Sequence, residues 1–196
     1  IKTTAVKKNG RWVLNGQKTF ISNGILADLV VVAARTGGTD TPSSQAMSLF
    51  VVERGTKGFE RGEPIRKIGL KAQDTAELFF DDCEIPEENL LGQEGLGFIY
   101  LMQKLQPERL VCAVGAQAAA ERCLEITVEY AKERRLFGKP LSKFQNTQFV
   151  LAELAAEIAV GRSFVDNLIR AHMEGKSVMS DTCMAKFWVT EMARRV

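Results

Sequence analysis

A carboxylate placed directly after a proline is the first candidate for chemistry in this sequence. Glu108 lies in the segment LQPERL (105–110), and Pro107 before it suits the first position of a helix, where its missing N–H costs no hydrogen bond. A glutamate at the next position is favoured by the positive end of the helix dipole. Taken locally, Glu108 is an ordinary residue of a first helical turn, with Arg109 as its natural ion-pair candidate.

A hydroxyl and an amide follow one another at a predicted strand end in KTFISNG (18–24). Ser22 and Asn23 stand there just before a glycine, and such a trio is typical of a turn with local side-chain to backbone hydrogen bonds. The residues alone therefore indicate a turn and require no ligand.

Two arginines close a helical pattern in ERRLFGK (133–139). Cations at a helix C-terminus stabilise it through the dipole. The fork geometry of Arg134 or Arg135 equally allows an arginine to hold a diphosphate. The SKFQ segment that follows fits a capping box from Ser142 to Gln145 and needs no ligand to explain it.

Other candidates for chemistry are weaker. GQEGLG (92–97) does not match GxGxxG and lacks the GK[ST] ending of a phosphate loop, so it indicates a turn into a helix. His172 is the only histidine and lies near a predicted helix end, which favours dipole compensation and argues against a Ser-His-Asp hydrolase. The cysteines show no CxxC pair and no metal-ligand spacing, so we expect no metal site and buried, reduced thiols at Cys83, Cys112, Cys123 and Cys183.

The first half of the chain has the pattern of β structure. RWVL and QKTFIS flank Asn15 and Gly16, which both tolerate positive φ, so a hairpin with a type I′ turn is predicted there. Apolar runs predict further strands at 29–34, 47–53 and 75–80, with loops at 36–44 and 61–64.

From about residue 96 the apolar period changes from two to 3.6, which predicts helices. The first is expected over about 107–135, ended by Gly138 and Pro140, with a buried stripe that includes Leu110, Val114, Ala118, Leu124, Val128 and Ala131. A second helix stops at Gly175 and carries on one face Leu151, Leu154, Ile158, Val165 and Ile169. A third begins near Asp181. The predicted class is α+β in segregated parts: a sheet or barrel-like β-domain over 1–90 and a helical bundle over 91–196.

Composition excludes several classes of partner. The 196 residues are 45% hydrophobic, enough for a substantial core, and the net charge of +2 gives no field that argues for nucleic acid. No apolar run approaches 18 residues, so no membrane span is predicted, and the N-terminus has no export-signal pattern. We therefore expect a soluble, intracellular protein.

Taken together and in order, these segments resemble the acyl-CoA dehydrogenase family. KTFISNG is followed by GFERGEPIRKIGLKAQDTAELFFDDCEIPEENLLGQEGLGF, QPERLV and ERRLFGKPLSKFQ, as in the family's middle β-domain and C-terminal helical domain. GLKAQDTAELFF and LQPERL resemble in particular the long-chain acyl-CoA dehydrogenase and isovaleryl-CoA dehydrogenase branch. The resemblance implies a β-domain that is incomplete at its N-terminus and a helical domain that is incomplete at its C-terminus.

The resemblance implies non-covalently bound FAD and oxidation of a fatty acyl-CoA to the trans-2-enoyl-CoA, with electron-transferring flavoprotein as acceptor. It places Phe20 at an aromatic position near the isoalloxazine, Ser22 at a hydroxyl position near flavin N5, and Asn23 in the same turn. It also places Arg134, with Phe137 and Gln145, at a site for the FAD diphosphate of a neighbouring subunit.

Such a shared site implies a homo-oligomer, usually a tetramer, in the bacterial cytoplasm or the mitochondrial matrix. Because the family's other FAD-contacting loop is not in this sequence, we expect a complete FAD site to need chain beyond these 196 residues.

The same resemblance gives Glu108 the role of general base. The α-proton must leave as the β-hydride moves to the flavin, so a carboxylate must lie within reach of the substrate Cα. Arg109 resembles an arginine near bound CoA, Gln106 lies in the same segment, and Ser44 resembles a serine of a CoA-contacting loop. Pocket depth is expected to depend on Ile99 and Met102.

Two alternatives remain open from sequence. One keeps the fold and the flavin but lets reduced flavin meet oxygen, as in an acyl-CoA oxidase or a nitroalkane-oxidase-like enzyme. The other is a non-catalytic assembly module derived from the fold. The joint presence of Ser22, Glu108 and Arg134 argues against the second alternative, and electron-acceptor preference decides the first.

Overall fold

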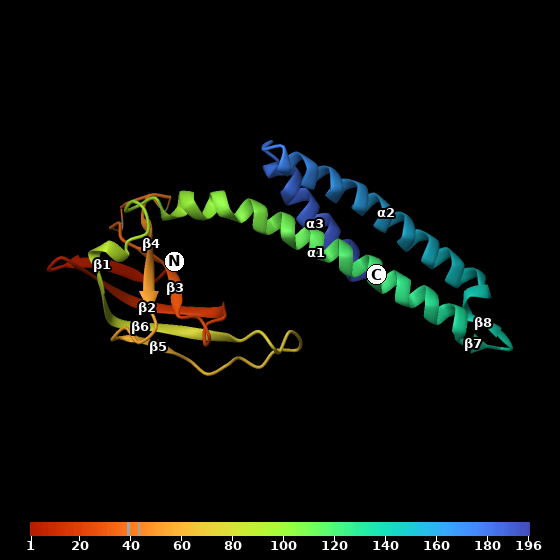
Figure 1. Cartoon of the computed structure of the whole chain (residues 1–196), viewed down its shortest axis with the longest axis horizontal. Coiled ribbons are helices and arrows are strands. Elements are labelled where there is room, and N and C mark those ends of the chain that lie inside the picture. The colour runs from red at the N-terminus through yellow and green to blue at the C-terminus, as the bar shows by residue number, and fades with distance from the viewer. Residues whose placement is uncertain (39, 43) are drawn as a thin grey trace. The chain divides into compact units, whose positions relative to one another are not determined.

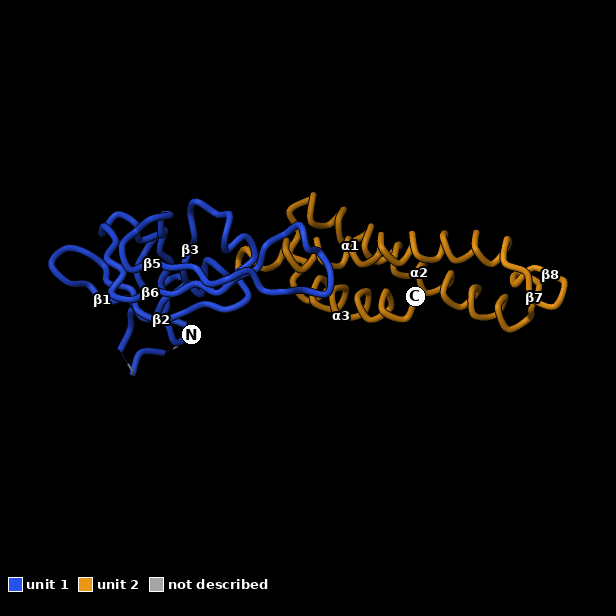
Figure 2. Tube along the Cα trace, turned by 90° about the horizontal axis from the view of Figure 1, so that it is seen from below, with its two compact units in different colours: residues 1–102 blue, residues 103–196 orange. Residues whose placement is uncertain are grey.

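The structure of the chain is a computed structural model that describes residues 1–38, 40–42 and 44–196. The described residues divide into two compact units, 1–102 and 103–196 (Figure 2). The first contains the sheet and the second contains mainly helices. The predicted α+β class with segregated parts is therefore confirmed. Positions 39 and 43 of the predicted 36–44 loop lie outside the described residues.

Over the described residues, unit 1 contains a six-stranded mixed sheet (Figure 1). The strand order is β4-β3-β1-β2-β6-β5. All pairs are antiparallel except β1 with β3, which meet in parallel at Thr4 and Arg35. The strands are β1 Thr4–Lys8, β2 Arg11–Ser22, β3 Leu29–Arg35, β4 Met47–Glu53, β5 Phe59–Arg61 and β6 Thr75–Pro86. The apolar runs at 29–34, 47–53 and 75–80 are strands, as predicted.

The first hairpin turns at Asn9 and Gly10, and the prediction of a turn at Asn15 and Gly16 is wrong. The φ angles of Asn9 and Gly10 are 51° and 75°, as a type I′ turn requires. Asn15 lies inside β2 because its side chain pairs with Asp82 of β6: Nδ2 donates to Oδ1 at 3.0 Å, and the Asp82 amide donates to Asn15 Oδ1 at 2.9 Å. The register of β2 on β6 shifts there, because β6 has two residues, Asp81 and Asp82, opposite the single residue Asn15 of β2.

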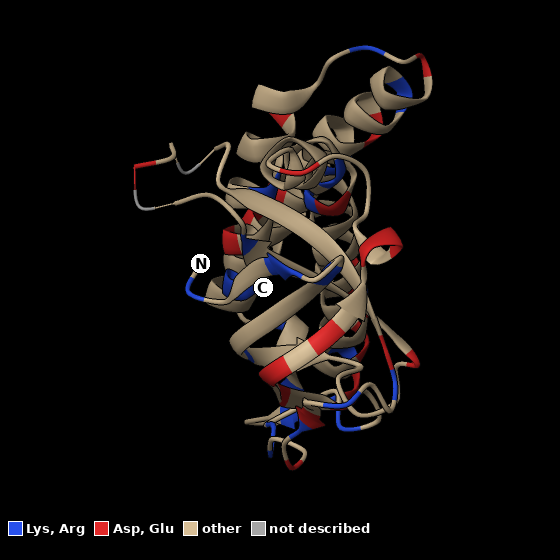
Figure 3. Cartoon of the chain, turned by 90° about the vertical axis from the view of Figure 1, so that its left-hand side faces the viewer, with Lys and Arg blue, Asp and Glu red and all other residues tan. Residues whose placement is uncertain are grey.

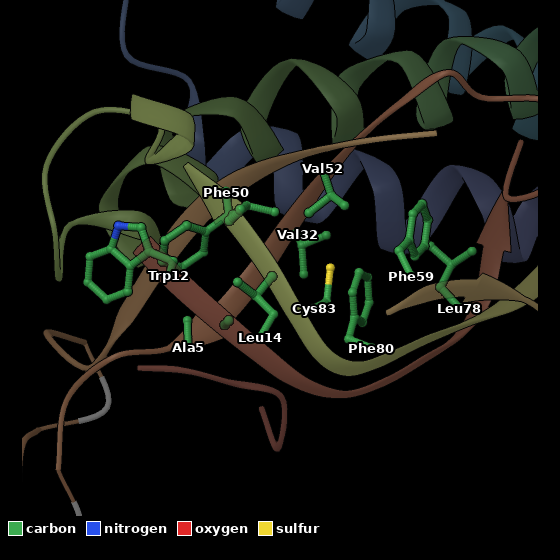
Figure 4. Packing of buried hydrophobic residues seen from close by; sticks show 12 residues of the cluster. Ala5, Trp12, Leu14, Val32, Phe50, Val52, Phe59, Leu78, Phe80 and Cys83 are labelled. Atoms are coloured by element: carbon green, nitrogen blue, oxygen red, sulfur yellow. The ribbon is translucent and has the colours of Figure 1, made fainter. Parts of the chain in front are cut away.

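Aromatic rings fill the core of unit 1 (Figure 4). Trp12 and Phe50 meet edge to face with centroids 5.1 Å apart, and Phe59 stacks on Phe80 at 5.0 Å. Edge-to-face and stacked pairs of this kind add about 0.5–1.5 kcal/mol each beyond their burial. Cys83 of β6 lies among these rings.

Cys83 is buried, whereas Cys112, Cys123 and Cys183 are exposed, so the prediction of buried thiols is wrong for these three. Each of the three lies on a helix but outside the face that packs on the other helices. Burial raises the pKa of the Cys83 thiol to about 11, which suppresses the reactive thiolate.

We expect the folded 196-residue chain to react with a disulfide reagent such as DTNB at three thiols. The fourth, Cys83, should react only after denaturant is added, because the folded sheet keeps its sulfur buried and protonated. Colour release counted before and after unfolding measures this. A Cys83→Ser variant should keep the count of three in both states, and four equivalents released from the folded chain would contradict the buried position.

Unit 2 is a bundle of helices. α1 (Gly97–Glu133) begins in unit 1 and continues through unit 2, and α2 (Gln145–Met173) and α3 (Met179–Arg195) follow it. The short strands β7 (Arg135–Leu136) and β8 (Lys139–Pro140) join α1 to α2, and one-turn 3₁₀ segments lie at Glu87–Asn89 and Leu141–Lys143. The buried helical core contains Leu110, Ala113, Ala120, Ile158, Val165, Leu168, Ala185, Val189 and Met192.

α1 begins ten residues before Pro107, so the prediction of a helix start at this proline is wrong. Gly97 marks the start because its backbone lies against β4: a Cβ built there would be 2.8 Å from the Met47 carbonyl oxygen. Pro107 lies inside the helix. Its ring removes one N–H from the helical ladder, and the helix continues through it. Glu108 is therefore an interior helical residue without a helix N-terminus beside it.

The other predicted helix boundaries also shift. α1 ends at Glu133, before Gly138 and Pro140, because the chain turns there into the β7–β8 hairpin. α2 begins at Gln145 with Phe144 at its N-cap and no capping side chain. The predicted capping box is therefore wrong, because Ser142 belongs to the preceding 3₁₀ turn. Among the described helices, none is long and apolar enough to cross a bilayer.

Candidate functional site

The predicted flavin-contacting residues of unit 1 lie at and just after a β-bulge near the end of β2. The pairing passes from Lys18 opposite Leu78 to Ile21 opposite Ala76, so β2 has one residue more than β6 in between. Phe20 takes up the difference at φ 59°, and its side chain is 73% exposed. A bulky residue at positive φ is an outlier, and a bulge re-aims side chains. The bulge therefore presents the Phe20 ring to the outside of the sheet.

The predicted turn after β2 is present, but backbone groups hold it. The Gly24 amide donates to the Ile21 carbonyl at 3.2 Å, and the Asn23 amide donates to the Asp74 carbonyl at 3.1 Å. Asn23 has φ 59°. The exposed Ser22 hydroxyl has no hydrogen bond to another described residue, so it is available to a ligand.

The predicted substrate residues lie on two segments. Ser44 is exposed in a turn of unit 1. Ile99 is 46% exposed in the first turns of α1. Gln106 and Arg109 are half-buried one turn apart on the same helix, and the Gln106 Oε1 is buried without a hydrogen-bond partner among the described residues. An unsatisfied buried oxygen at this position is a candidate acceptor for a ligand donor.

Glu108 lies on the outer side of α1. Leu110 and Ala113 are buried in the helical core, whereas Glu108 is exposed. The predicted ion pair with Arg109 is not formed, because adjacent helical residues do not face each other. Within the described residues, no hydrogen bond or ion pair engages the Glu108 carboxylate. It is therefore free to accept a proton from a ligand.

A buried polar network joins α1 to α2, and the sequence patterns did not predict it. Gln117 is fully buried, and its Nε2 donates to Glu121 Oε1 at 2.8 Å and to the Ile158 carbonyl at 2.9 Å. Arg162 Nε donates to Glu121 Oε1 at 2.7 Å, and its Nη2 bonds the second carboxylate oxygen. Gly161 leaves room for the amide: a Cβ there would be 2.4 Å from Gln117 Oε1. The network fixes the register of the two helices.

The charges of this network stabilise one another. The hydrogen bond from Arg162 lowers the pKa of Glu121 against the opposing effect of burial, and the same bond raises the pKa of Arg162.

The predicted buried stripe of α1 is right at Leu110 but wrong at Ala118, which is exposed. Gln117 takes the buried place, where its Nε2 donates two hydrogen bonds and its Oε1 has no partner among the described residues.

The β7–β8 connection joins α1 to α2 (Figure 1). Two of the predicted diphosphate-site residues, Arg134 and Phe137, lie in this connection, and the third, Gln145, begins α2. Phe137 and Gly138 form the tip of the connection at φ 50° and 81°, and the Phe137 ring is 95% exposed. Gln145 is exposed at the first position of α2. Arg135 Nη1 donates back to the Gly138 carbonyl at 3.3 Å, whereas the exposed Arg134 side chain bonds no other described residue. Of the two arginines, Arg134 is the one whose guanidinium is engaged by no other described residue.

Charge and metal chemistry add little to this description. Basic and acidic residues are interspersed over the face shown in Figure 3, in agreement with the net charge of +2. Among the described residues, no cluster of His, Cys, Asp or Glu has the arrangement of a metal site. The groups available to a ligand are the Phe20 ring and the Ser22 hydroxyl in unit 1, and the Glu108 carboxylate and the Arg134 guanidinium in unit 2.

The chain belongs to the acyl-CoA dehydrogenase family. Residues 1–83 match the acyl-CoA dehydrogenase middle domain, and residues 95–196 match the acyl-CoA dehydrogenase C-terminal domain. The resemblance seen in the ordered motifs is thereby confirmed.

Individual relatives agree with this assignment. The mitochondrial long-chain specific acyl-CoA dehydrogenase of Sus scrofa is 45% identical over all 196 residues, which make up 46% of its length. The crystal structure of an acyl-CoA dehydrogenase from Geobacillus kaustophilus is 57% identical with a TM-score of 0.96, over the whole of this chain and 51% of that one. A structure of PigA with FAD and proline is 29% identical with a TM-score of 0.92, over the whole of this chain and 50% of PigA. The chain thus spans about half the length of these relatives.

Proposed function

We propose that the protein carrying this chain is an FAD-dependent acyl-CoA dehydrogenase that converts acyl-CoA thioesters to trans-2-enoyl-CoA, with Glu108 as the general base. The observation that carries the proposal is the position of Glu108 in the LQPERL segment of a chain that belongs to the acyl-CoA dehydrogenase family. The structure leaves this carboxylate exposed on α1 and engaged by no described residue. It can therefore come within reach of a substrate proton, as a general base must.

The residues present fit FAD. Phe20 at φ 59° and Phe137 at φ 50° are bulky residues in a region that such side chains rarely adopt, and both rings are largely exposed. The two-residue turn between β7 and β8 requires the positive φ of Phe137, and its ring lies edge to face with Phe144 at 6.5 Å, but a bulky residue is an unusual choice for such a turn. Strain at bulky residues concentrates at ligand sites. Both positions are flavin positions in the family resemblance. We infer that the two rings pack on FAD.

The roles of the remaining cofactor residues follow from their chemistry. When bound, FAD supplies a hydride acceptor at N5. Ser22 would donate a hydrogen bond to the flavin from its unengaged hydroxyl, and Arg134 would bind the diphosphate by charge-assisted hydrogen bonds. Gln145, exposed at the start of α2, would add an amide hydrogen bond in the same inter-subunit site. The proposal includes a homo-oligomer, a tetramer in the family resemblance.

The substrate residues would hold the acyl-CoA so that Cα comes within reach of Glu108. Arg109 supplies a cation for the CoA moiety, and the unsatisfied Gln106 Oε1 can accept a hydrogen bond from it. Ser44 would contact the same moiety. Ile99 and Met102 would form part of the acyl pocket. We propose electron-transferring flavoprotein as the physiological electron acceptor.

The experiment is anaerobic reduction of the flavin in the protein expressed from its complete coding sequence. Long-chain acyl-CoA should bleach the flavin and form enoyl-CoA in equal amounts, because each turnover transfers one α-proton and one β-hydride. A 2,2-dimethylacyl-CoA of the same length is the matched control, since it has no α-proton to lose. Bleaching by the dimethyl compound, or none by acyl-CoAs of any length, would contradict the proposal. Rapid reoxidation by oxygen in air would instead favour an oxidase.

A further inference from the structure

Two arginines hold the backbone of the turn that follows Ser22. Arg54, just after β4, donates from Nη2 to the carbonyl oxygens of Ile25, Leu26 and Ala27 at 2.9, 2.8 and 3.1 Å. Arg61, at the end of β5, donates from Nη1 to the Ile25 oxygen at 2.9 Å and from Nη2 to the Ala27 oxygen at 2.7 Å. Residues 25–27 thus place their carbonyl groups around two guanidinium groups. We call this arrangement the arginine clamp.

Two aspartates, Asp74 and Asp28, also hold this turn. The Asp74 Oδ2 accepts the Ile25 amide at 2.7 Å, and the Asp74 carbonyl accepts the Asn23 amide at 3.1 Å. Arg54 also donates from Nε to Asp28 Oδ1 at 2.7 Å. The chain from Asn23 to Asp28 is therefore tied to β4, β5 and the start of β6, and these are separate segments of unit 1.

The clamp is more than an ordinary surface turn requires. Two like charges share one set of acceptors, and burial, together with the charge of Arg54, lowers the pKa of Arg61. Turns are commonly stabilised by a local side-chain to backbone hydrogen bond from a residue such as Asn or Asp. A side chain that must be held rigidly against a ligand, in contrast, needs supporting hydrogen bonds of this kind.

We propose that Arg54 and Arg61 are positioning residues that fix the turn after β2 and thereby hold the Ser22 hydroxyl in place against the flavin. The inference rests on the proposed function in one respect, the contact of Ser22 with FAD. The distance along the chain is short: the clamp begins at Ile25, three residues after Ser22, and Asn23 between them is held at positive φ. Movement of the turn would therefore be transmitted directly to Ser22.

The two arginines overlap in what they bind, because both contact the oxygens of Ile25 and Ala27. Either one alone still bridges the ends of the turn. We therefore expect Arg54→Met and Arg61→Met each to have a small effect on how firmly the turn is held. The double variant should have a larger effect than the two single effects multiplied together. Such a pattern is the expected behaviour of residues in one hydrogen-bond network.

The first test needs no bound flavin and uses the apoprotein expressed from its complete coding sequence. In the Arg54→Met/Arg61→Met variant, amide hydrogen exchange over residues 23–28 should accelerate at least tenfold, while exchange in the middle of β2 and β6 stays within twofold. The double variant Arg11→Met/Arg66→Met removes the same charge from exposed positions of unit 1 and should leave exchange in the turn unchanged. Unchanged exchange in the first variant, or equal acceleration throughout the sheet, would overturn the clamp.

The second test asks whether the clamp acts through Ser22, in protein expressed from its complete coding sequence. The clamp double variant should slow anaerobic flavin reduction at saturating acyl-CoA about tenfold or more, with KM within twofold, since small misplacements of a reacting pair cost up to about 100-fold in rate. In a Ser22→Ala background the same double variant should cause less than a twofold further loss. A full tenfold loss in that background would overturn the positioning role. A wild-type protein that acyl-CoA does not reduce would contradict the proposed function, while the exchange test still decides the clamp.

Discussion

Replacing Glu108 by glutamine will slow flavin reduction by acyl-CoA about 10³-fold, within the range that a positioned general base contributes. The amide keeps the size of the side chain but cannot accept the α-proton. The exposed Glu108 carboxylate forms no hydrogen bond or ion pair with another described residue, so its replacement leaves no buried group unpaired. Loss of rate should therefore occur without loss of stability. Anaerobic stopped-flow bleaching of the flavin and thermal unfolding measure the two effects separately.

Glu129→Gln is the matched control for this variant. Glu129 is also an exposed glutamate of α1 without a side-chain partner among the described residues. Its replacement changes the net charge in the same way and should leave the bleaching rate within twofold. Glu108→Asp should retain partial activity, since it keeps the base but shortens its reach by one methylene. Full-rate bleaching in Glu108→Gln would place the base elsewhere and would remove the central residue of the proposed mechanism.

Replacing Arg134 by alanine will weaken FAD binding by roughly 30- to 1,000-fold, as expected for losing about 2–4 kcal/mol of charge-assisted hydrogen bonding to a phosphate. The Arg134 backbone is held by its amide to the Tyr130 carbonyl and by its carbonyl to the Leu141 amide, at 2.8 and 2.7 Å. These bonds do not involve the side chain. The α1–α2 connection should therefore keep its shape in the variant. Flavin retained after gel filtration, and titration of the apoprotein with FAD, measure the effect.

The adjacent arginine provides a close control. Arg135→Ala removes the same charge one residue along, but its guanidinium bonds the Gly138 carbonyl of its own turn. We expect Arg135→Ala to change the FAD dissociation constant less than threefold. Arg134→Lys should recover part of the affinity, since an ammonium keeps the charge but loses the bidentate fork. Equal losses from the two alanine variants would show that the general charge of this turn, and no specific contact, holds the cofactor.

Much of the fold could be predicted because the apolar pattern of a strand or helix is local information. The run from Leu29 to Arg35 forms a strand because it contains consecutive β-branched residues that fit a sheet. The same residues predict a strand from the sequence. The family could be predicted because several motifs occur together in one order, although each of them alone has a local structural explanation. The positions of the turns depended on partners far away in sequence.

Asn15 and Gly16 illustrate the limit. The dipeptide is an excellent turn sequence, but Asp82, 67 residues later, bonds the Asn15 side chain within β2. A single-sequence pattern contains no information about which of the three Asn-Gly pairs, at 9–10, 15–16 and 23–24, will find such a partner. Pro107 is a second case, because proline is commonest at helix starts and the packing of Gly97 on β4 moves the start ten residues upstream.

The candidate site residues also divide into those that the sequence could predict and those that it could not. Exposed Ser22, Glu108 and Arg134 could be selected from sequence, because an order of motifs points to them. The positive φ of Phe20 could not, because it arises from a register shift against β6. Gln117 was missed because glutamine is normally a surface residue, and its burial depends on the Ile158 carbonyl of another helix.

The close approach of Gln117 to Gly161 also limits how the sequence can change in evolution. Any side chain at position 161 would place its Cβ 2.4 Å from the Gln117 Oε1, so a larger residue there requires the Gln117 side chain to move or to be replaced by a shorter one. Shortening residue 117 first avoids the contact, since a small residue at 117 tolerates glycine at 161. In alignments of acyl-CoA dehydrogenases, the two positions should therefore vary as a pair, although 44 residues separate them.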